Sequence, residues 1–164
     1  MTKIGLISDT HGWLDPACLK HFANCDEIWH AGDLGNITIA EELKIHKPFK
    51  AVYGNIDGYE VRCEYPEVLE WQCEEITVLM IHIGGYPPKY HLESKKMITS
   101  IKPQLFISGH SHILKIMYDS VQSCLHINPG AAGKHGWHQI RTIVRFTIDG
   151  KEIKDCEVIE LGKR

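Results

Sequence analysis

The sequence has no long hydrophobic run and no excess of positive charge. Its apolar runs, such as Ile4–Ile7 and Val78–Ile81, are far too short to span a bilayer. Lys and Arg number 18 against 21 Asp and Glu, and the net charge of -3 provides no overall field that would attract nucleic acid or an anionic membrane. Met1-Thr2-Lys3 leads into a strand-like segment and not into a secretory leader. We therefore expect a cytoplasmic protein that binds neither a membrane nor long nucleic acid.

Paired cysteine motifs and linkers are also missing. None of the cysteines forms a C-x-x-C pair, and a chain of 164 residues can form a core without disulfides. The chain has no Ser/Gly tract, no run of like charge and no internal repeat. We expect a single domain over residues 1–164 with free, mostly buried thiols. The six cysteines are Cys18, Cys25, Cys63, Cys73, Cys124 and Cys156.

Short apolar runs of strand length recur along the chain, and each is followed by Gly, Asp, Asn or Pro. This pattern is typical of buried strands that end in functional loops. The runs are Lys3–Ser8, Glu27–His30, Phe49–Tyr53, Ile76–His82, Leu105–Ser108 and Leu125–Asn128.

Helical stretches separate several of these strands. Asp15-Pro16 is a good N-cap with proline at the first helical position, and it predicts a helix that ends near Asn24. Further helices are expected over Thr38–His46 and Glu93–Ile101. The resulting β-α-β-α-β order predicts a parallel first half with right-handed crossovers.

From Ile113 onward the pattern favours strands joined by tight turns. Asp149-Gly150 between Thr142–Ile148 and Lys151–Leu161 predicts a hairpin with a type I′ turn. The expected fold class is therefore α/β, with two packed mixed β-sheets flanked by helices.

Histidine is abundant, with 11 residues, and several lie beside Gly and Asp at predicted strand ends. Imidazole, carboxylate and amide groups without thiolates suit a divalent ion such as Mn, Fe, Co, Ni or Zn. In an extended segment, residues two apart send both side chains to one face, so Asp9 and His11, and likewise His110 and His112, can converge on one site. The five strand-end segments are Asp9-Thr10-His11-Gly12, Gly32-Asp33, Gly54-Asn55-Ile56-Asp57, His82 and Gly109-His110-Ser111-His112.

Each segment alone also has an ordinary structural interpretation. Asp-x-His after a strand is more often a loop cap, and Gly-Asp or Gly-Asn is a common turn dipeptide. His82 at the end of an apolar strand is more often a core histidine than a ligand. Gly-His-x-His is the most specific segment. All five together, each at a strand end, favour a metal site.

The ordered series D-x-H, G-D, G-N, H and G-H-x-H resembles that of the calcineurin-like metallophosphoesterases, over nearly the whole chain as far as Asn128-Pro129-Gly130. The sequence is most similar to the compact branch of YfcE-type phosphodiesterases, which is related to the scaffold protein Vps29. The resemblance implies a β-sandwich flanked by helices, in agreement with the fold expected from the residues.

The resemblance also implies two divalent ions, Mn²⁺ being the leading candidate and Fe, Ni, Co or Zn the others. Asp33 would bridge the ions, and a hydroxide between them would attack phosphorus in line. Asp33, Asn55 and His110 are the expected catalytic residues. One ion would be held by Asp9, His11, Asp33 and His112, and the other by Asp33, Asn55, His82 and His110.

The sequence departs from the family where a proton donor is expected. Many relatives have histidine after the G-N asparagine, but Ile56 stands there and cannot protonate a leaving oxygen. A metal-bound water, His135 or His138 could supply the proton. The change favours an activated ester or a diester over an alkyl phosphomonoester.

Other departures affect the surroundings of the site. The usual H-G-H is His82-Ile83-Gly84 here, and Ala131 stands where relatives usually have serine. The segment 133–141 either contacts the substrate, through a phosphate oxygen or a base, or is a solvated loop anchored by Trp137.

Three further positions keep two interpretations each. Asp57 either orients a ligand or loop or simply closes a turn, and His30 either orients a ligand or is a buried strand residue. The apolar segment around Tyr86-Pro87-Pro88 and Tyr90 forms a subunit contact or a lid, so a homo-oligomer is an open expectation.

The leading functional hypothesis is a metal-dependent phosphodiesterase acting on a small phosphoester, with nucleotides among the candidates. The alternative is an inactive or weakly active protein-interaction scaffold of the Vps29 type. A nuclease or a cyclic-nucleotide phosphodiesterase is a third hypothesis within the enzyme class. The acidic net charge disfavours a long nucleic acid as substrate.

Overall fold

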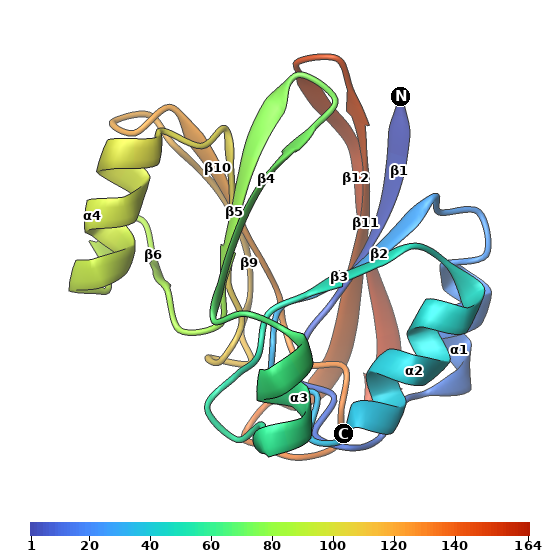
Figure 1. The fold of residues 1–164 in the computed structure, drawn as a ribbon. Coiled ribbons are helices and arrows are strands. Elements are labelled where there is room, and N and C mark those ends of the chain that lie inside the picture. Colours follow the sequence, from blue (N-terminus) through green and yellow to red (C-terminus); the bar gives the residue numbers. More distant parts are fainter.

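Two five-stranded mixed sheets pack face to face in the computed structural model, which describes residues 1–164 (Figure 1). The first sheet contains β1 (Thr2–Ile7), β2 (Glu27–His30), β3 (Phe49–Ala51), β11 (Ile140–Asp149) and β12 (Glu152–Lys163). Its strand order is β12-β11-β1-β2-β3.

The second sheet has the order β4-β5-β8-β10-β9 and is accompanied by a two-stranded ribbon of β6 and β7. Its strands are β4 (Val68–Cys73), β5 (Ile76–Ile81), β8 (Leu105–Ile107), β9 (Leu114–Asp119) and β10 (Cys124–Pro129). The ribbon consists of β6 (Gly85–Tyr86) and β7 (Lys89–Tyr90).

Helices cover the outer faces of both sheets (Figure 1). On the side of the first sheet lie α1 (Pro16–His21) and α2 (Ile37–His46), and α4 (Leu92–Ile101) lies on the side of the second. The short α3 (Tyr59–Glu64) lies at one end of the sandwich. Side-chain caps begin the first two helices: Asp15 accepts a hydrogen bond from the Ala17 N–H, and Asn36 accepts one from the Thr38 N–H.

The parallel strands fix where the functional loops lie. In the first sheet β1, β2 and β3 are parallel, and in the second β5, β8 and β10 are parallel. The carboxyl ends of these strands meet at the same end of the sandwich, which we call the site end. The loops that follow β1, β2, β3, β5 and β8 therefore lie together.

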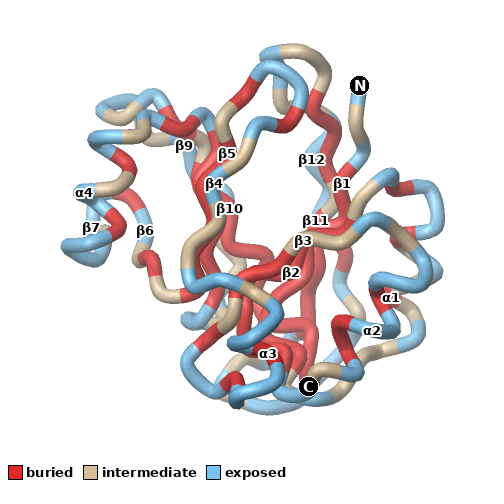
Figure 2. The backbone as a smooth tube through the Cα atoms, in the orientation of Figure 1, coloured by how far each residue is buried: buried red, intermediate tan, exposed pale blue.

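The main core is formed by side chains of both sheets. The strands of the two sheets contain most of the buried backbone segments (Figure 2). Trp29 at the centre of the core packs edge-on against Trp71 and Phe146. A second apolar cluster lies under α1 and α2, and a third lies between α4 and the second sheet. Each large side chain buried in this way contributes roughly 1.5–3 kcal/mol, so the core gives the site-end loops a rigid base.

The predicted fold class and the parallel opening are confirmed, whereas several elements were not predicted. The short α3 buries only Val61 and has too few residues for a helical period. The edge strand β4 places Glu70 and Gln72 on an exposed face, so it does not read as an apolar run. The ribbon strands have two residues each.

The final hairpin forms as predicted, but its turn is shifted by one residue. Asp149 pairs with Glu152, so the central turn residues are Gly150 and Lys151, not Asp149 and Gly150. Only Gly150 has a positive φ, of 58°. A type I′ turn needs positive φ at both central positions, so this turn follows the type II′ pattern, with glycine first.

The six cysteines are free, as expected, with four of them buried and Cys63 and Cys156 exposed. None of the helices is long and apolar enough to cross a membrane.

Candidate metal centre

The seven predicted ligands all lie on the site-end loops, and five of them have a left-handed backbone. Their φ angles range from 48° to 68°. Asp and His tolerate this conformation better than β-branched residues, but it remains uncommon and costly outside glycine. These residues are Asp9, His11, Asp33, His110 and His112.

One group of donor atoms comes from the loops after β1 and β8. His112 Nε2 lies 3.2 Å from Asp9 Oδ1 and 3.3 Å from His11 Nε2. The distance from His11 Nε2 to Asp9 Oδ1 is 3.8 Å. Asp9 is buried and the two histidines are half-buried, so this group lies at the floor of the site.

A second group comes from the loops after β2, β3, β5 and β8. His82 Nε2 lies 3.2 Å from Asp33 Oδ2. Asn55 Oδ1 lies 3.1 Å from His82 Nε2 and 2.9 Å from His110 Nδ1. The Asn55 and His110 side chains are exposed, and therefore accessible from solvent.

Asp33 connects the two groups. Its Oδ2 lies 3.2 Å from His82 Nε2 in the second group and 3.5 Å from His11 Nε2 in the first. Its Oδ1 accepts a hydrogen bond from the Ile56 N–H, which fixes the carboxylate plane. One oxygen of Asp33 therefore faces both groups.

The two carboxylate oxygens of Asp9 also have different surroundings. Oδ2 accepts hydrogen bonds from the Ser8 hydroxyl and the His110 N–H. Oδ1 is buried and has no hydrogen-bond partner. An unpartnered buried carboxylate oxygen is costly, and a cation in the space that it shares with His11 and His112 would remove that cost.

Hydrogen bonds to the protein fix the tautomers of two histidines. His82 Nδ1 lies 2.8 Å from the Ala31 carbonyl and donates to it, which leaves a lone pair on Nε2. His138 Nε2 donates to the Gly133 carbonyl, so His138 Nδ1 accepts from His112 Nδ1 at 3.3 Å. In the neutral ring the Nε2 lone pair of His112 then faces Asp9, so both histidines have a nitrogen that could hold a metal ion.

The histidine rings beside the two carboxylates lower the pKa of both. Burial alone would raise the pKa of Asp9, but the neighbouring His11 and His112 hold it well below its usual range. Burial likewise opposes ionisation of Asp33, whose pKa is lowered mainly by His82. Two ionised carboxylates and four imidazoles with amide oxygen beside them are a donor set that suits borderline divalent cations.

The loops pack so closely that side chains are excluded at two glycines. A Cβ on Gly54 would lie 2.0 Å from Asp33 Oδ1, and a Cβ on Gly136 would lie 2.1 Å from His112 Nδ1. Gly136 also has a φ of 127°, which few other residues adopt. Both glycines let backbone support a ligand directly.

Asp57 and His30 combine their two interpretations: Asp57 closes its own turn and also binds a second loop, and His30 is a buried strand residue that also contacts the loops of the site. The Asp57 carboxylate accepts hydrogen bonds from the Leu34, Gly35 and Gly54 N–H groups and so ties two ligand loops together. His30 Nδ1 accepts from the Gly32 N–H, and its Nε2 donates to the Thr10 hydroxyl. Burial lowers the pKa of His30 to about 4, so this ring is neutral.

The segment 133–141 is a largely exposed loop that borders the hollow, but Trp137 is not its anchor and Arg141 is not free to bind a substrate. Trp137 is 98% exposed and therefore does not anchor the loop. Arg141 is buried, pairs with Asp15 and donates to the Leu161 and Lys163 carbonyls, so it does not face a substrate. His138 anchors the loop, and both of its ring nitrogens are used in doing so.

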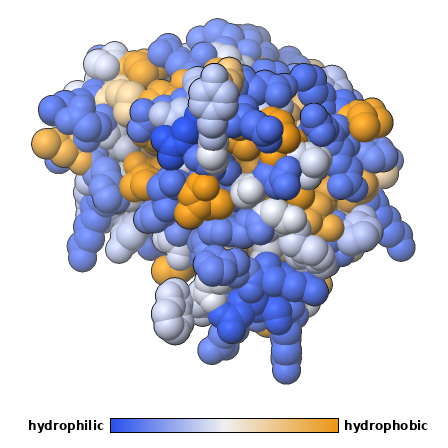
Figure 3. All heavy atoms as spheres, turned by 60° about the horizontal axis from the view of Figure 1, so that its bottom comes forward, coloured by the Kyte–Doolittle hydropathy of each residue, from blue (hydrophilic) through white to orange (hydrophobic).

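The centre opens into a hollow of about 280 Å³ at the site end. Figure 3 turns this end toward the viewer and shows hydrophobic residues scattered among hydrophilic ones. The walls of the hollow are formed by His11, Asp33, Asn55, Ile56, His110, Ser111, His112, His135, Gly136 and Trp137.

Two supporting groups have no signal in the sequence. The Ala31 and Gly133 carbonyls orient histidines, but a backbone acceptor cannot be recognised from residue type. From the sequence, His138 is a candidate proton source or substrate contact, whereas its position beside His112 makes it an orienting group.

A family model described as a calcineurin-like phosphoesterase superfamily domain matches residues 2–151. The chain belongs to this superfamily. A probable metallophosphoesterase of Methanothermobacter thermautotrophicus is 28% identical over 172 residues, and the match covers 97% of this chain and 92% of that protein. Family membership and the two groups of ligand-type residues support a metal-dependent hydrolase of phosphoesters.

Solved structures share the fold. A novel archaeal phosphodiesterase has a TM-score of 0.74 at 23% identity, with 97% of this chain and 99% of that chain covered. Wild-type Vps29 of Entamoeba histolytica in complex with Zn²⁺ has a TM-score of 0.74 at 15% identity, with 96% and 98% covered. The architecture is therefore common to phosphodiesterases and to Vps29.

Proposed function

We propose that this protein is a phosphodiesterase with two divalent metal ions. Asp9, His11, Asp33 and His112 would hold one ion, and Asp33, Asn55, His82 and His110 would hold the other. The observation that carries the proposal is the orientation of Asp33 Oδ2 toward both groups of donor atoms. Unpartnered Asp9 Oδ1 supports it.

Two ions at such a centre would activate water and offset the negative charge that develops on the attacking and leaving oxygens. Asp33 would hold the two ligand groups in register, because the Ile56 N–H fixes its carboxylate. Asn55 and His110 are the exposed members of the set, so a phosphate entering from solvent would meet them first. We assign the catalytic roles to Asp33, Asn55 and His110.

The identity of the proton donor restricts the substrate. Ile56 is exposed and has no ionisable group, while His138 has both ring nitrogens engaged. His135 lines the hollow, with its ring centroid 4.9 Å from that of His11, and is the remaining side-chain candidate. A site without a well-placed general acid favours esters with good leaving groups. This supports a small phosphodiester over an alkyl monoester as substrate.

Oxygen and imidazole donors without thiolate support Mn²⁺ as the working metal, with Fe, Co, Ni and Zn as the other candidates. Six free cysteines suit a reducing compartment and support a cytoplasmic location.

A second candidate is a protein-interaction scaffold of the Vps29 type. It is favoured by the shared fold and by the exposed Trp137 beside the centre. Vps29 of Entamoeba histolytica also binds Zn²⁺, so metal-dependent hydrolysis, and not metal content alone, separates the two functions.

The test compares hydrolysis of an aryl phosphodiester and its matching monoester by chelator-treated protein, before and after addition of Mn²⁺. We expect Mn²⁺ to restore turnover, with the diester preferred, and Asp33→Ala to abolish it. Absence of turnover with every candidate metal, in protein that is folded, would favour the scaffold.

A further inference from the structure

A separate cavity of about 180 Å³ lies beside the metal centre. It is lined by β6 on one side and by β9 and β10 on the other, and it reaches Ser111 and the proposed ligand His110. Its walls are largely apolar and include Ile83, Tyr86 and Ile113. A group attached to a phosphate at the metal centre could therefore enter it.

A buried histidine without partners lines this cavity. His126 on β10 is fully buried, and neither of its ring nitrogens has a hydrogen-bond partner. Its ring packs against Phe106 on one side, with centroids 5.3 Å apart. Burial lowers the pKa of His126 to about 4, so the ring is neutral and offers one donor and one acceptor.

Two further polar groups of the cavity are available. Lys115 Nζ lies 3.7 Å from the centroid of the Tyr86 ring and has no carboxylate partner. The Ser111 oxygen accepts hydrogen bonds from Ile113 N–H and Asn128 Nδ2 but donates none. The cavity thus combines apolar walls with a lysine that contacts only an aromatic face, the Ser111 hydroxyl hydrogen and the unpaired ring nitrogens of His126.

The size and chemistry of the cavity indicate a flat ring. A dry cavity of about 150 Å³ can hold a benzene molecule. A plain hydrocarbon ring would leave His126 unpaired, whereas a nitrogen heterocycle with carbonyl groups offers it both an acceptor and a donor. Lys115 suits an electron-rich carbonyl oxygen on the same ring.

We propose that this cavity binds a nucleobase, so that the substrate is a nucleoside phosphodiester whose phosphate lies at the metal centre. The proposal rests on the phosphodiesterase function proposed above. His126 and Lys115 would determine substrate preference and would take no part in bond breaking.

The test uses two diesters with the same leaving group: thymidine 5′-(4-nitrophenyl phosphate) and methyl 4-nitrophenyl phosphate. Their chemical step is matched, and only the first carries a base. With Mn²⁺ we expect a kcat/KM about tenfold or more higher for the thymidine ester. His126→Phe and Lys115→Met should each lower that value about tenfold, mainly through KM, and leave the methyl ester unchanged.

Lys95→Met is the matched control, because Lys95 is an exposed lysine of α4 outside the cavity. If His126→Phe does not fold, Lys115→Met carries the test. Equal kcat/KM for the two esters, or variants that leave the preference intact, would overturn the base pocket and leave the phosphodiesterase intact.

A binding measurement separates failure of the pocket from failure of the phosphodiesterase. If neither ester is hydrolysed with any metal, thymidine is titrated into metal-free protein and the His126 ring signals are followed by NMR. Saturable shifts in the wild type that are lost in Lys115→Met would support the pocket. Unchanged signals would overturn it.

Discussion

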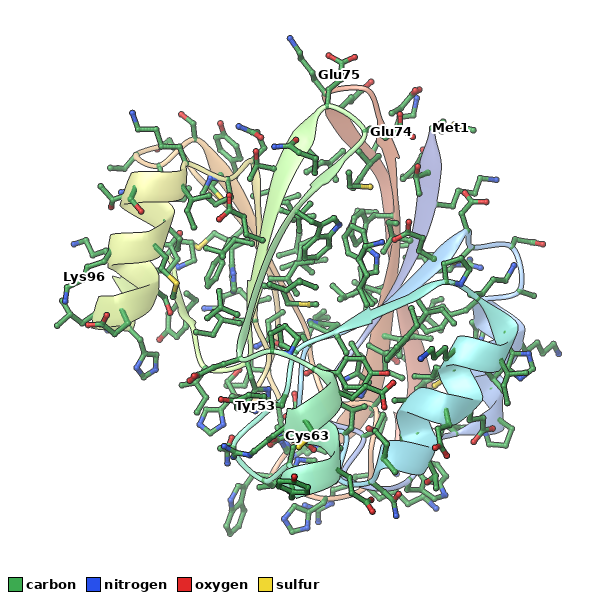
Figure 4. The ribbon with its side chains drawn as sticks, in the orientation of Figure 1. Met1, Tyr53, Cys63, Glu74, Glu75 and Lys96 are labelled. Carbon is green, nitrogen blue, oxygen red and sulfur yellow. The ribbon has the colours of Figure 1, made fainter.

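The two ends of the sandwich use the same backbone conformation for different purposes. At the far end, opposite the site, left-handed residues such as Glu74 and Ser123 lie in the turns that reverse the chain. Figure 4 shows Glu74 and Met1 at this end and Cys63 of α3 at the other. The Glu74 carboxylate is exposed and pairs with the amino group of Met1.

At the site end the left-handed residues are the proposed ligands themselves. Asp9 and Asp33 are buried, and Asp9 Oδ1 has no partner in the protein. In the surface turns the left-handed backbone serves to reverse the chain. The ligand loops are instead held in place by hydrogen bonds from residues elsewhere in the sequence, such as Asp57 and His30. Left-handed backbone angles that are not needed to reverse the chain therefore indicate the functional end of the molecule.

The largest effect is expected where an added side chain would collide with a proposed ligand at the site end. In Gly54→Ala the new Cβ would lie 2.0 Å from Asp33 Oδ1 and displace the proposed bridging carboxylate. We expect loss of bound Mn²⁺ and a fall in diester turnover of about a thousandfold or more, because metal ions supply several kcal/mol of charge stabilisation. Gly58→Ala is the control, since its Cβ meets no atom within 4 Å. Full metal binding by Gly54→Ala would contradict the assigned role of Asp33.

The loss of folding stability at acidic pH should come from buried histidines and not from exposed groups at the far end. The pKa of His126 falls from an ordinary 6.5 to about 4, so the unfolded chain binds more protons between these pH values. The contribution of His126 to stability is complete above pH 6.5 and is lost as the pH falls toward 4, by about 3 kcal/mol.

Urea unfolding of metal-free protein at several pH values measures this loss. His126→Phe should make the free energy of unfolding less dependent on pH between 6.5 and 4. Glu74→Gln, at the far end, should leave the slope above about pH 5.5 unchanged, because Glu74 titrates near 4.5 in the unfolded chain and its hydrogen bond with the Met1 amino group lowers its pKa further in the folded protein. An unaltered slope in His126→Phe would show that His126 is not the source.

A smaller effect is expected from the chain of hydrogen bonds behind His112. His138→Ala removes the group that fixes the His112 tautomer, and loss of such a partner typically lowers metal affinity 10–100-fold. Calorimetric titration with Mn²⁺ should show one weakened site and one unchanged site. His46→Ala, an exposed histidine of α2, is the control. Two unaffected sites would place His138 outside the support of the centre.

The smallest expected effect is on folding stability, and it is measured with one matched substitution at each end. Ser123→Gly and His110→Gly each remove a side chain from a left-handed residue, with φ of 52° and 68°. Glycine avoids a cost of about 1–2 kcal/mol but increases the entropy of the unfolded chain, so each metal-free variant should change stability by about 1 kcal/mol or less. Only His110→Gly should lose metal. Equal metal binding by both variants would remove the distinction between the ends.

Much of the centre could be predicted because each ligand follows a strand. The carboxyl ends of parallel strands meet at one end of a sheet, so the ligands after β1, β2 and β3 could be expected together, and likewise those after β5 and β8. A contact such as that between Asp9 and His112 joins the two sheets and depends on how they pack. The apolar runs of β1, β2, β5 and β8 are strong signals, since buried strands need continuous hydrophobic residues.

The unpredicted features depend on contacts between distant segments. Trp137 and Arg141 look alike as loop candidates for substrate binding, yet one is exposed and the other is buried against Asp15. The cavity at His126 lies between β6 and the strands β9 and β10, and the two residues of β6 are too few to show a pattern. Such placements are set by tertiary packing, which local sequence does not encode.

The two-ion centre is tested most directly by counting Mn²⁺ on the chelator-treated protein after it has been reloaded and freed of excess metal. Elemental analysis should give two ions per chain, and electron paramagnetic resonance should show a magnetically coupled pair, as expected for ions about 3.5–4 Å apart. One ion per chain, two uncoupled ions, or none would contradict the proposal that Asp33 joins two metal sites.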